Sequence, residues 1–101
     1  MAPITAVQTL TTIANTLVAT GKYESPADAL RALALDQINR KIVLYERRVS
    51  RFEKKHRTTF DKFTRKLHGR ASTSQEDDWL EWETALEMLE EWRRVKRELS
   101  N

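Results

Sequence analysis

The chain has no cysteine, and its 101 residues include only two glycines and two prolines. Without cysteine it can form no disulfide, thiolate metal site or cysteine nucleophile, and it fits a reducing compartment, so we expect a cytoplasmic protein. Two glycines cannot build a phosphate-binding glycine loop. No apolar run approaches the roughly 20 residues of a membrane span, and nothing resembles a signal peptide. We therefore expect no membrane partner.

Candidates for catalysis are also few. Only His56 and His68 could titrate near neutral pH, and their spacing matches no metal-binding motif. The acidic run Glu76-Asp77-Asp78 lacks the alternating ligands and the glycine of a calcium loop. We expect no cofactor, no metal and no enzymatic activity.

Charge is separated into blocks along the chain. Residues 40 to 70 carry twelve Lys or Arg against three acids, whereas residues 71 to 92 carry eight acids and no base. Such blocks suggest either a nucleic-acid face or two segments that neutralise each other. Mutual pairing is the preferred interpretation, because the blocks are adjacent and similar in charge. The bases at positions 40 to 55 are expected all around their helix, which argues against base stacking there.

Local patterns predict a strand followed by helices. The uncharged, β-branched segment 3 to 9 predicts a short strand that would need a second copy of the chain to pair with it. Apolar spacing then predicts a helix over about residues 9 to 20, ended by Gly21. Ser25-Pro26-Ala27-Asp28 predicts the next helix start, since serine caps it, proline suits its first position and the acid meets its dipole.

No Gly or Pro interrupts this second helix before His56, so it can reach about 45 Å, more than a compact monomer of this size covers. Its apolar seam steps by three and four residues, which is typical of a helix–helix interface. The seam could contact either the chain's own later helices or a second copy. Its members are Leu35, Ile38, Ile42, Tyr45, Val49 and Phe52.

Two further helices are predicted in the C-terminal half. A third helix follows a cap at Thr58 or Thr59 and ends at Gly69, and a final helix begins near Gln75 after a polar linker. Trp79 and Trp82 lie on the final helix among many acids. Such tryptophans either fill the chain's own core or anchor a partner protein, and the sequence leaves both open.

The segment from Leu17 to Leu33, which reads LVATGKYESPADALRAL, resembles the two-helix unit of ParD-like and CopG-like ribbon-helix-helix antitoxins. The segments TFDKF from Thr59 and DWLEWE from Asp78 are similar to TumA-type antitoxins. The first resemblance covers about a third of the chain. It implies an obligate dimer in which two copies of the first strand pair and can enter the DNA major groove. The strand lacks Lys and Arg, which departs from the pattern and puts operator binding in doubt.

These observations predict a mainly α protein with a ribbon-helix-helix-like dimer module, residues 1 to 56 with an extended second helix, and a C-terminal helical partner-binding segment, residues 57 to 101. The resemblance implies DNA-binding residues Thr5, Gln8, Thr9, Lys22 and Ser25. The expected dimer interface is Leu17, Leu30, Leu33, Leu35, Ile38 and Ile42. The expected partner-binding residues are Phe60, Phe63, Trp79, Trp82, Leu86 and Leu89.

The leading hypothesis is an antitoxin-like homodimer that binds a toxin through its C-terminal helices, with autoregulatory DNA binding as a further activity. Its acidic final helix would suit a toxin with a basic cleft. The alternatives are a DNA-binding transcriptional regulator without a toxin and a homodimeric helical scaffold whose charge blocks neutralise each other.

Overall fold

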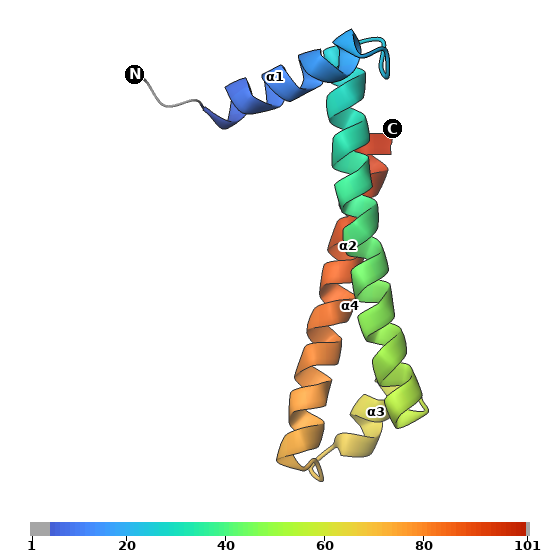
Figure 1. Ribbon diagram of the computed structural model, residues 1–101. Helices are drawn as coiled ribbons and strands as arrows, with labels where there is room; N and C mark the ends of the chain where they lie inside the picture. Colours follow the sequence, from blue (N-terminus) through green and yellow to red (C-terminus); the bar gives the residue numbers. More distant parts are fainter. Residues whose placement is uncertain (1–4, 101) are drawn as a thin grey trace. The chain divides into compact units, whose positions relative to one another are not determined.

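A computed structural model describes residues 5 to 100, and within them the chain is mainly α, as predicted, with no strand (Figure 1). The four helices are α1 (Ala6–Ala19), α2 (Pro26–His56), α3 (Phe60–Leu67) and α4 (Thr73–Ser100). The chain divides into two compact units, an N-terminal unit up to Gln37 and a hairpin unit from Ile38 onward. The boundary therefore lies inside α2, and not after His56. Among the described helices, none is both long and apolar enough to cross a membrane.

The first described segment is a helix, so the predicted strand is wrong from Thr5 onward. Pro3 and Ile4 lie outside the described residues. The Thr5 hydroxyl accepts a hydrogen bond from the Gln8 amide at 3.1 Å, and the Gln8 side chain accepts one from the Thr5 amide at 2.8 Å. This reciprocal capping box starts α1. The threonines fit the helix because their hydroxyls donate to carbonyls four residues earlier, as Thr9 does to Thr5.

The turn between α1 and α2 agrees with the prediction. Gly21 has a φ of 79°, the left-handed conformation that favours glycine, and the Lys22 amide closes the turn on the Leu17 carbonyl at 3.2 Å. The Ser25 hydroxyl accepts a hydrogen bond from the Asp28 amide at 3.1 Å, and α2 begins at Pro26. Serine, proline and aspartate thus define this helix start.

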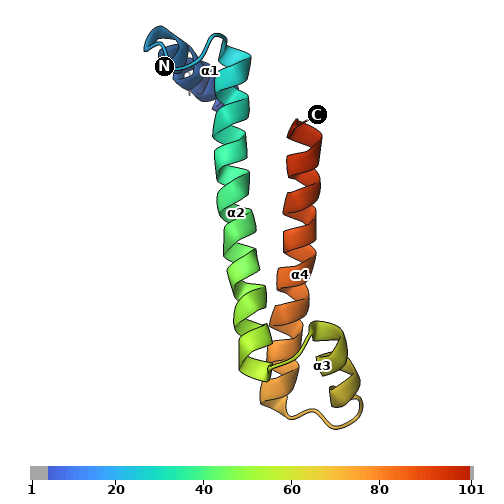
Figure 2. The same cartoon turned by 90° about the vertical axis from the view of Figure 1, so that its right-hand side faces the viewer.

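In the hairpin unit the later part of α2 and α4 run antiparallel side by side, and α3 lies at the closed end between them in the sequence (Figures 1 and 2). α2 ends at His56, followed by Arg57 in the left-handed conformation with a φ of 53°. Thr59 then caps α3 through its hydroxyl, which accepts from the Lys62 amide at 3.4 Å.

Two apolar clusters hold the hairpin together. One joins Ile38 and Ile42 of α2 to Leu89 of α4, and the other joins Phe52, Phe63 and Trp82 from three helices. Tyr45 and Val49 pack against these clusters from α2. Most of the seam predicted on the second helix is therefore covered by the chain's own α4, one of the two alternatives that the sequence allowed.

Replacing Trp82 by alanine should destabilise the hairpin strongly. The side chain is fully buried among Phe52, Phe60 and Phe63, so we expect a loss of about 3 to 5 kcal/mol in the free energy of unfolding. Leu80 lies two residues earlier on α4 and is 59% exposed, so Leu80→Ala should change this free energy by about 0.5 kcal/mol or less. Urea unfolding followed by circular dichroism measures both. Equal effects of the two substitutions would contradict the packing described.

Candidate interaction surfaces

The N-terminal unit leaves an apolar stripe on α1 only half covered. At about 100° per residue, Val7, Leu10, Ile13 and Leu17 share one side of the helix. Leu17, near the end of α1, is half-buried, whereas Val7 is 72%, Leu10 48% and Ile13 42% exposed. α1 also contains no charged residue. The first two turns of α1 therefore present an uncharged apolar surface, which we call the α1 stripe (Val7, Leu10 and Ile13).

The buried core of the N-terminal unit consists of small alanine side chains. The only fully buried side chains described in it are Ala14 on α1 and Ala29 on α2, and two alanines permit a close approach of helices. Small side chains bury little apolar area, so each contributes little stabilisation. Leu33 on α2 is also 40% exposed. The unit thus has much exposed apolar surface for its small core.

The predicted dimer residues do not form one surface. Leu17, Leu30 and Leu35 are half-buried in the N-terminal unit, and Leu33 is exposed. Ile38 and Ile42 instead belong to the hairpin core with Leu89. Val7 was predicted to lie in a strand and is therefore absent from the predicted dimer residues, although the stripe can be read from the sequence once the helix begins at Ala6.

The predicted DNA-binding residues are divided between two helix starts. The side chains of Thr5, Gln8 and Thr9 make the cap and first-turn hydrogen bonds of α1, and Ser25 caps α2. Lys22 is exposed in the turn. Because no strand is described here, these residues do not form a ribbon, and most of their polar atoms bond the chain's own backbone.

The predicted partner-binding residues pack inside the hairpin unit. Phe63, Trp82 and Leu89 are buried, while Phe60, Trp79 and Leu86 are half-buried against them. Trp79 also donates its indole N–H to the Thr64 hydroxyl at 2.8 Å. This arrangement matches the alternative in which the tryptophans fill the chain's own core, and it makes these residues poor anchors for a partner of the folded hairpin.

The outward side of α4 is acidic. Glu76, Glu83, Glu87 and Glu90 recur along one side of α4 at helical spacing and form no ion pair within residues 5 to 100. Glu76 lies beside α3 at one end of this row, and the exposed Leu80 lies at its edge toward α2. We call these five residues the acidic α4 face. Among the described residues, the ion pairs between α2 and α4 involve only Asp78 and the Arg93–Glu46 pair at 3.3 Å. The two charge blocks therefore neutralise each other much less than the sequence predicted.

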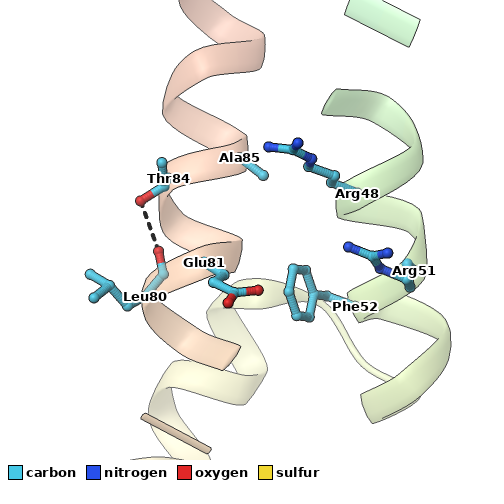
Figure 3. A pocket seen from close by; sticks show the side chains of 7 residues that line it. All are labelled: Arg48, Arg51, Phe52, Leu80, Glu81, Thr84 and Ala85. Atoms are coloured by element: carbon cyan, nitrogen blue, oxygen red, sulfur yellow. Dashed lines mark hydrogen bonds between the residues drawn. The ribbon is translucent and has the colours of Figure 1, made fainter. Parts of the chain in front are cut away.

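An open groove of about 500 Å³ runs between α2 and α4 (Figure 3). Arg48 and Arg51 line it from α2, and Leu80, Glu81 and Thr84 line it from α4. The Arg48 guanidinium lies 5.1 Å from the Tyr45 ring centre, and that of Arg51 lies 5.8 Å from the Phe52 ring centre. Within the described part of the chain neither guanidinium has an acidic partner, so both remain available to an anion.

A polar cluster ties the end of α2 to the start of α4. Asp78 accepts from His56 Nε2 at 2.8 Å and pairs with Lys55 Nζ at 2.7 Å. The His56 ring lies 4.2 Å from the Phe63 ring centre and stacks on Trp82 at 6.0 Å. Hydrogen bonding from Lys55 lowers the pKa of Asp78, although burial opposes that shift. Nowhere in residues 5 to 100 do three His, Asp or Glu side chains gather closely enough to hold a metal ion.

We expect Asp78→Asn to destabilise the hairpin at neutral pH. Because the pKa of Asp78 is lowered in the folded state, its carboxylate contributes stability above the ordinary value of 3.8, and this contribution is lost as pH falls through the lower folded pKa. The wild type should therefore be less stable below about pH 3.8 than at neutral pH. The stability difference between wild type and variant, measured by urea unfolding across pH, should shrink over the same interval. A difference that stays constant down to low pH would contradict this assignment.

Comparisons with known proteins yield no relative from which a function could be transferred. No protein-family model matches the chain, and neither any curated protein nor any solved structure shows significant similarity to it. The resemblance to ribbon-helix-helix antitoxins therefore stays a hypothesis. Functional inference depends on the surfaces of the chain itself.

Proposed function

We propose that this chain is an antitoxin-like binding protein that dimerises through its N-terminal unit and holds a toxin or other protein partner on its hairpin unit. The observation that carries the proposal is the α1 stripe: three large apolar side chains exposed on a helix without charge. Exposed apolar surface concentrated on one helix face is typical of an interaction site.

A second copy of the chain is the occupant that best suits the α1 stripe. A two-fold interface places the same surface on both subunits, so any charge on it would oppose a like charge near the axis. α1 has no charge to repel its own copy. Two α1 helices can therefore pair through Val7, Leu10 and Ile13, and this helix pair takes the place of the predicted ribbon. Exposed Leu33 on α2 adds apolar area in the same unit.

A basic protein surface is the proposed partner of the acidic α4 face. Its four glutamates, which form no ion pair within residues 5 to 100, would attract a cationic cleft, as in a toxin that binds RNA, and Leu80 supplies an apolar contact beside them. This places the partner on the outside of α4. It differs from the sequence prediction, in which Trp79 and Trp82 made the contact, because those rings already pack on Phe60 and Phe52.

The second candidate is a homodimeric helical scaffold without a toxin. It is favoured by the packing of all six predicted partner residues within the hairpin itself. Capture from the native host with the tagged chain as bait separates the two candidates. A stoichiometric partner that wild type retains and a Glu83→Lys/Glu87→Lys variant loses supports the binding protein, and its absence supports the scaffold.

The dimer can be tested with Leu10→Glu. A carboxylate in the middle of the α1 stripe would be desolvated and would face its own copy, so the dissociation constant should rise at least tenfold, or about 1.4 kcal/mol. Asn15→Glu is the matched control, because Asn15 is exposed on the opposite, polar side of the same helix. Sedimentation equilibrium at micromolar concentration measures the association, and circular dichroism checks that α1 is retained.

We expect a wild-type dimer, a Leu10→Glu protein shifted to monomer and an unchanged Asn15→Glu dimer. A wild-type protein that stays monomeric and fully helical would rule out dimerisation through α1. Equal weakening by both substitutions would mean that charge on α1 acts generally, and not through the stripe.

A further inference from the structure

The groove between α2 and α4 has opposite charges on its two walls. Arg48 and Arg51 extend into it from α2, and Glu81 extends into it from α4 (Figure 3). None of these three side chains forms an ion pair within residues 5 to 100. The groove therefore has a basic wall beside an acidic one, with no ion pair across it.

Both walls also carry apolar side chains. At about 100° per residue, the bases at positions 40 to 55 fall within an arc of roughly 140°, so the prediction that they surround the helix is wrong. Leu44 lies within that arc, about 40° from Arg48, and is 37% exposed. On α4, half-buried Met88 lies about 20° from Glu81 around the helix. Each wall thus combines charge with an apolar side chain.

The opposite charges lie at nearly the same height along the hairpin. Arg51 immediately precedes Phe52 in α2. Glu81 immediately precedes Trp82 in α4. The rings of Phe52 and Trp82 stack with their centres 5.8 Å apart, so the residues just before them are also level with each other. A second hairpin placed at the same height would therefore meet each charge with its opposite.

Symmetry allows this meeting. A two-fold axis parallel to the helices preserves every height and places α2 of each copy opposite α4 of the other. Arg51 of each copy then faces Glu81 of the other. Leu44 and Met88 are each seven residues from these positions, in antiparallel helices, so they face each other too. An axis across the helices would instead oppose the two basic walls, which repel each other.

We propose that the groove between α2 and α4 is a second self-association surface, filled by the same groove of another copy of the chain. The two hairpins pair face to face as a four-helix bundle, with α2 of each copy against α4 of the other. Two Arg51–Glu81 pairs and two Leu44–Met88 contacts hold the bundle together. The contact lies entirely in the hairpin unit, so it is separate from the proposed α1 dimer.

The charges of the groove favour a second copy over other occupants. Glu81 would repel the phosphates of a nucleic acid or of an anionic membrane, as well as a wholly acidic protein surface. Arg48 and Arg51 would repel a wholly basic one. The occupant must carry both signs at this spacing, and the groove itself does so. The acidic α4 face lies at least about 120° away around the helix, so it remains open to a basic partner.

Pairing of the hairpins should be weak. It buries few large apolar side chains, and exposed ion pairs contribute little each, so we expect a dissociation constant on the order of 0.1 mM. At micromolar concentration the α1 contact would then act alone. Where the local concentration is high, the second contact would join α1 dimers into larger assemblies.

The test uses the full chain with Leu10→Glu, which removes the α1 dimer, as a common background. Arg51→Glu or Glu81→Arg is added to it, and each puts like charges opposite each other in the paired hairpins. Lys54→Glu and Glu53→Arg are the matched controls, because they make the same changes in charge at exposed positions outside the groove. Sedimentation equilibrium from about 10 µM to about 1 mM measures each protein and each equimolar mixture, and circular dichroism checks the helices.

We expect the background protein to dimerise over this range. Arg51→Glu and Glu81→Arg should each raise the dissociation constant at least about tenfold, because each homodimer then contains two pairs of like charges. Their equimolar mixture should restore association to within about threefold, since both cross-pairs then have opposite charges. The two control proteins and their mixture should differ from the background by about twofold or less.

A background protein that stays monomeric at about 1 mM would overturn the proposal. So would a mixture of the two groove variants without recovery, which would mean that Arg51 and Glu81 act within one chain. An equal gain in the control mixture would assign the association to net charge and not to the groove. Failure of the α1 dimer is distinguishable, because the wild type would then be monomeric at micromolar concentration while the groove variants still weakened association at higher concentration.

Discussion

Trp82 lies where α2, α3 and α4 meet, and the hairpin depends on burying it. Its ring stacks 5.8 Å from Phe52 and lies 5.4 Å from both Phe60 and Phe63. A ring of this size removes on the order of 150 to 250 Å² from water, a large share of the core in a unit of this size. Its buried indole N–H has no acceptor among the described residues, so the ring contributes through packing and not through a hydrogen bond.

Because the aromatic side chains are buried in the hairpin, other residues must make any contact with a partner. With Phe63, Trp82 and Leu89 inside the hairpin, the outside of that unit consists mainly of charge, acidic on α4 and basic on α2. The N-terminal unit differs, because its core is built from alanines and its larger apolar side chains stay exposed on α1. The molecule therefore offers three chemically distinct surfaces: apolar, acidic and basic. Each suits a different kind of partner.

Local signals in the sequence predicted the helices well where a cap fixed their start. The Ser25-Pro26 start of α2, its end at His56 and the Thr59 cap of α3 all agree with the structure. The strand at the N-terminus failed because β-branched composition was given more weight than the Thr5 and Gln8 capping pair, which satisfies the exposed amides of a helix start. Composition is a weak guide there, since threonine hydroxyls can bond within a helix.

The sequence by itself determined the helical class, the absence of cysteine chemistry and the separation of charge, because these follow from composition and from spacing along one helix. Only the tertiary structure decided that the α2 seam meets α4, that Trp79 and Trp82 serve the core, and that Arg47 and Arg51 have no acidic partner within residues 5 to 100. The physical reason is that an apolar stripe or a charged block on one helix does not specify which other helix or molecule it will contact. Its partner depends on which other helix the chain's turns bring beside it.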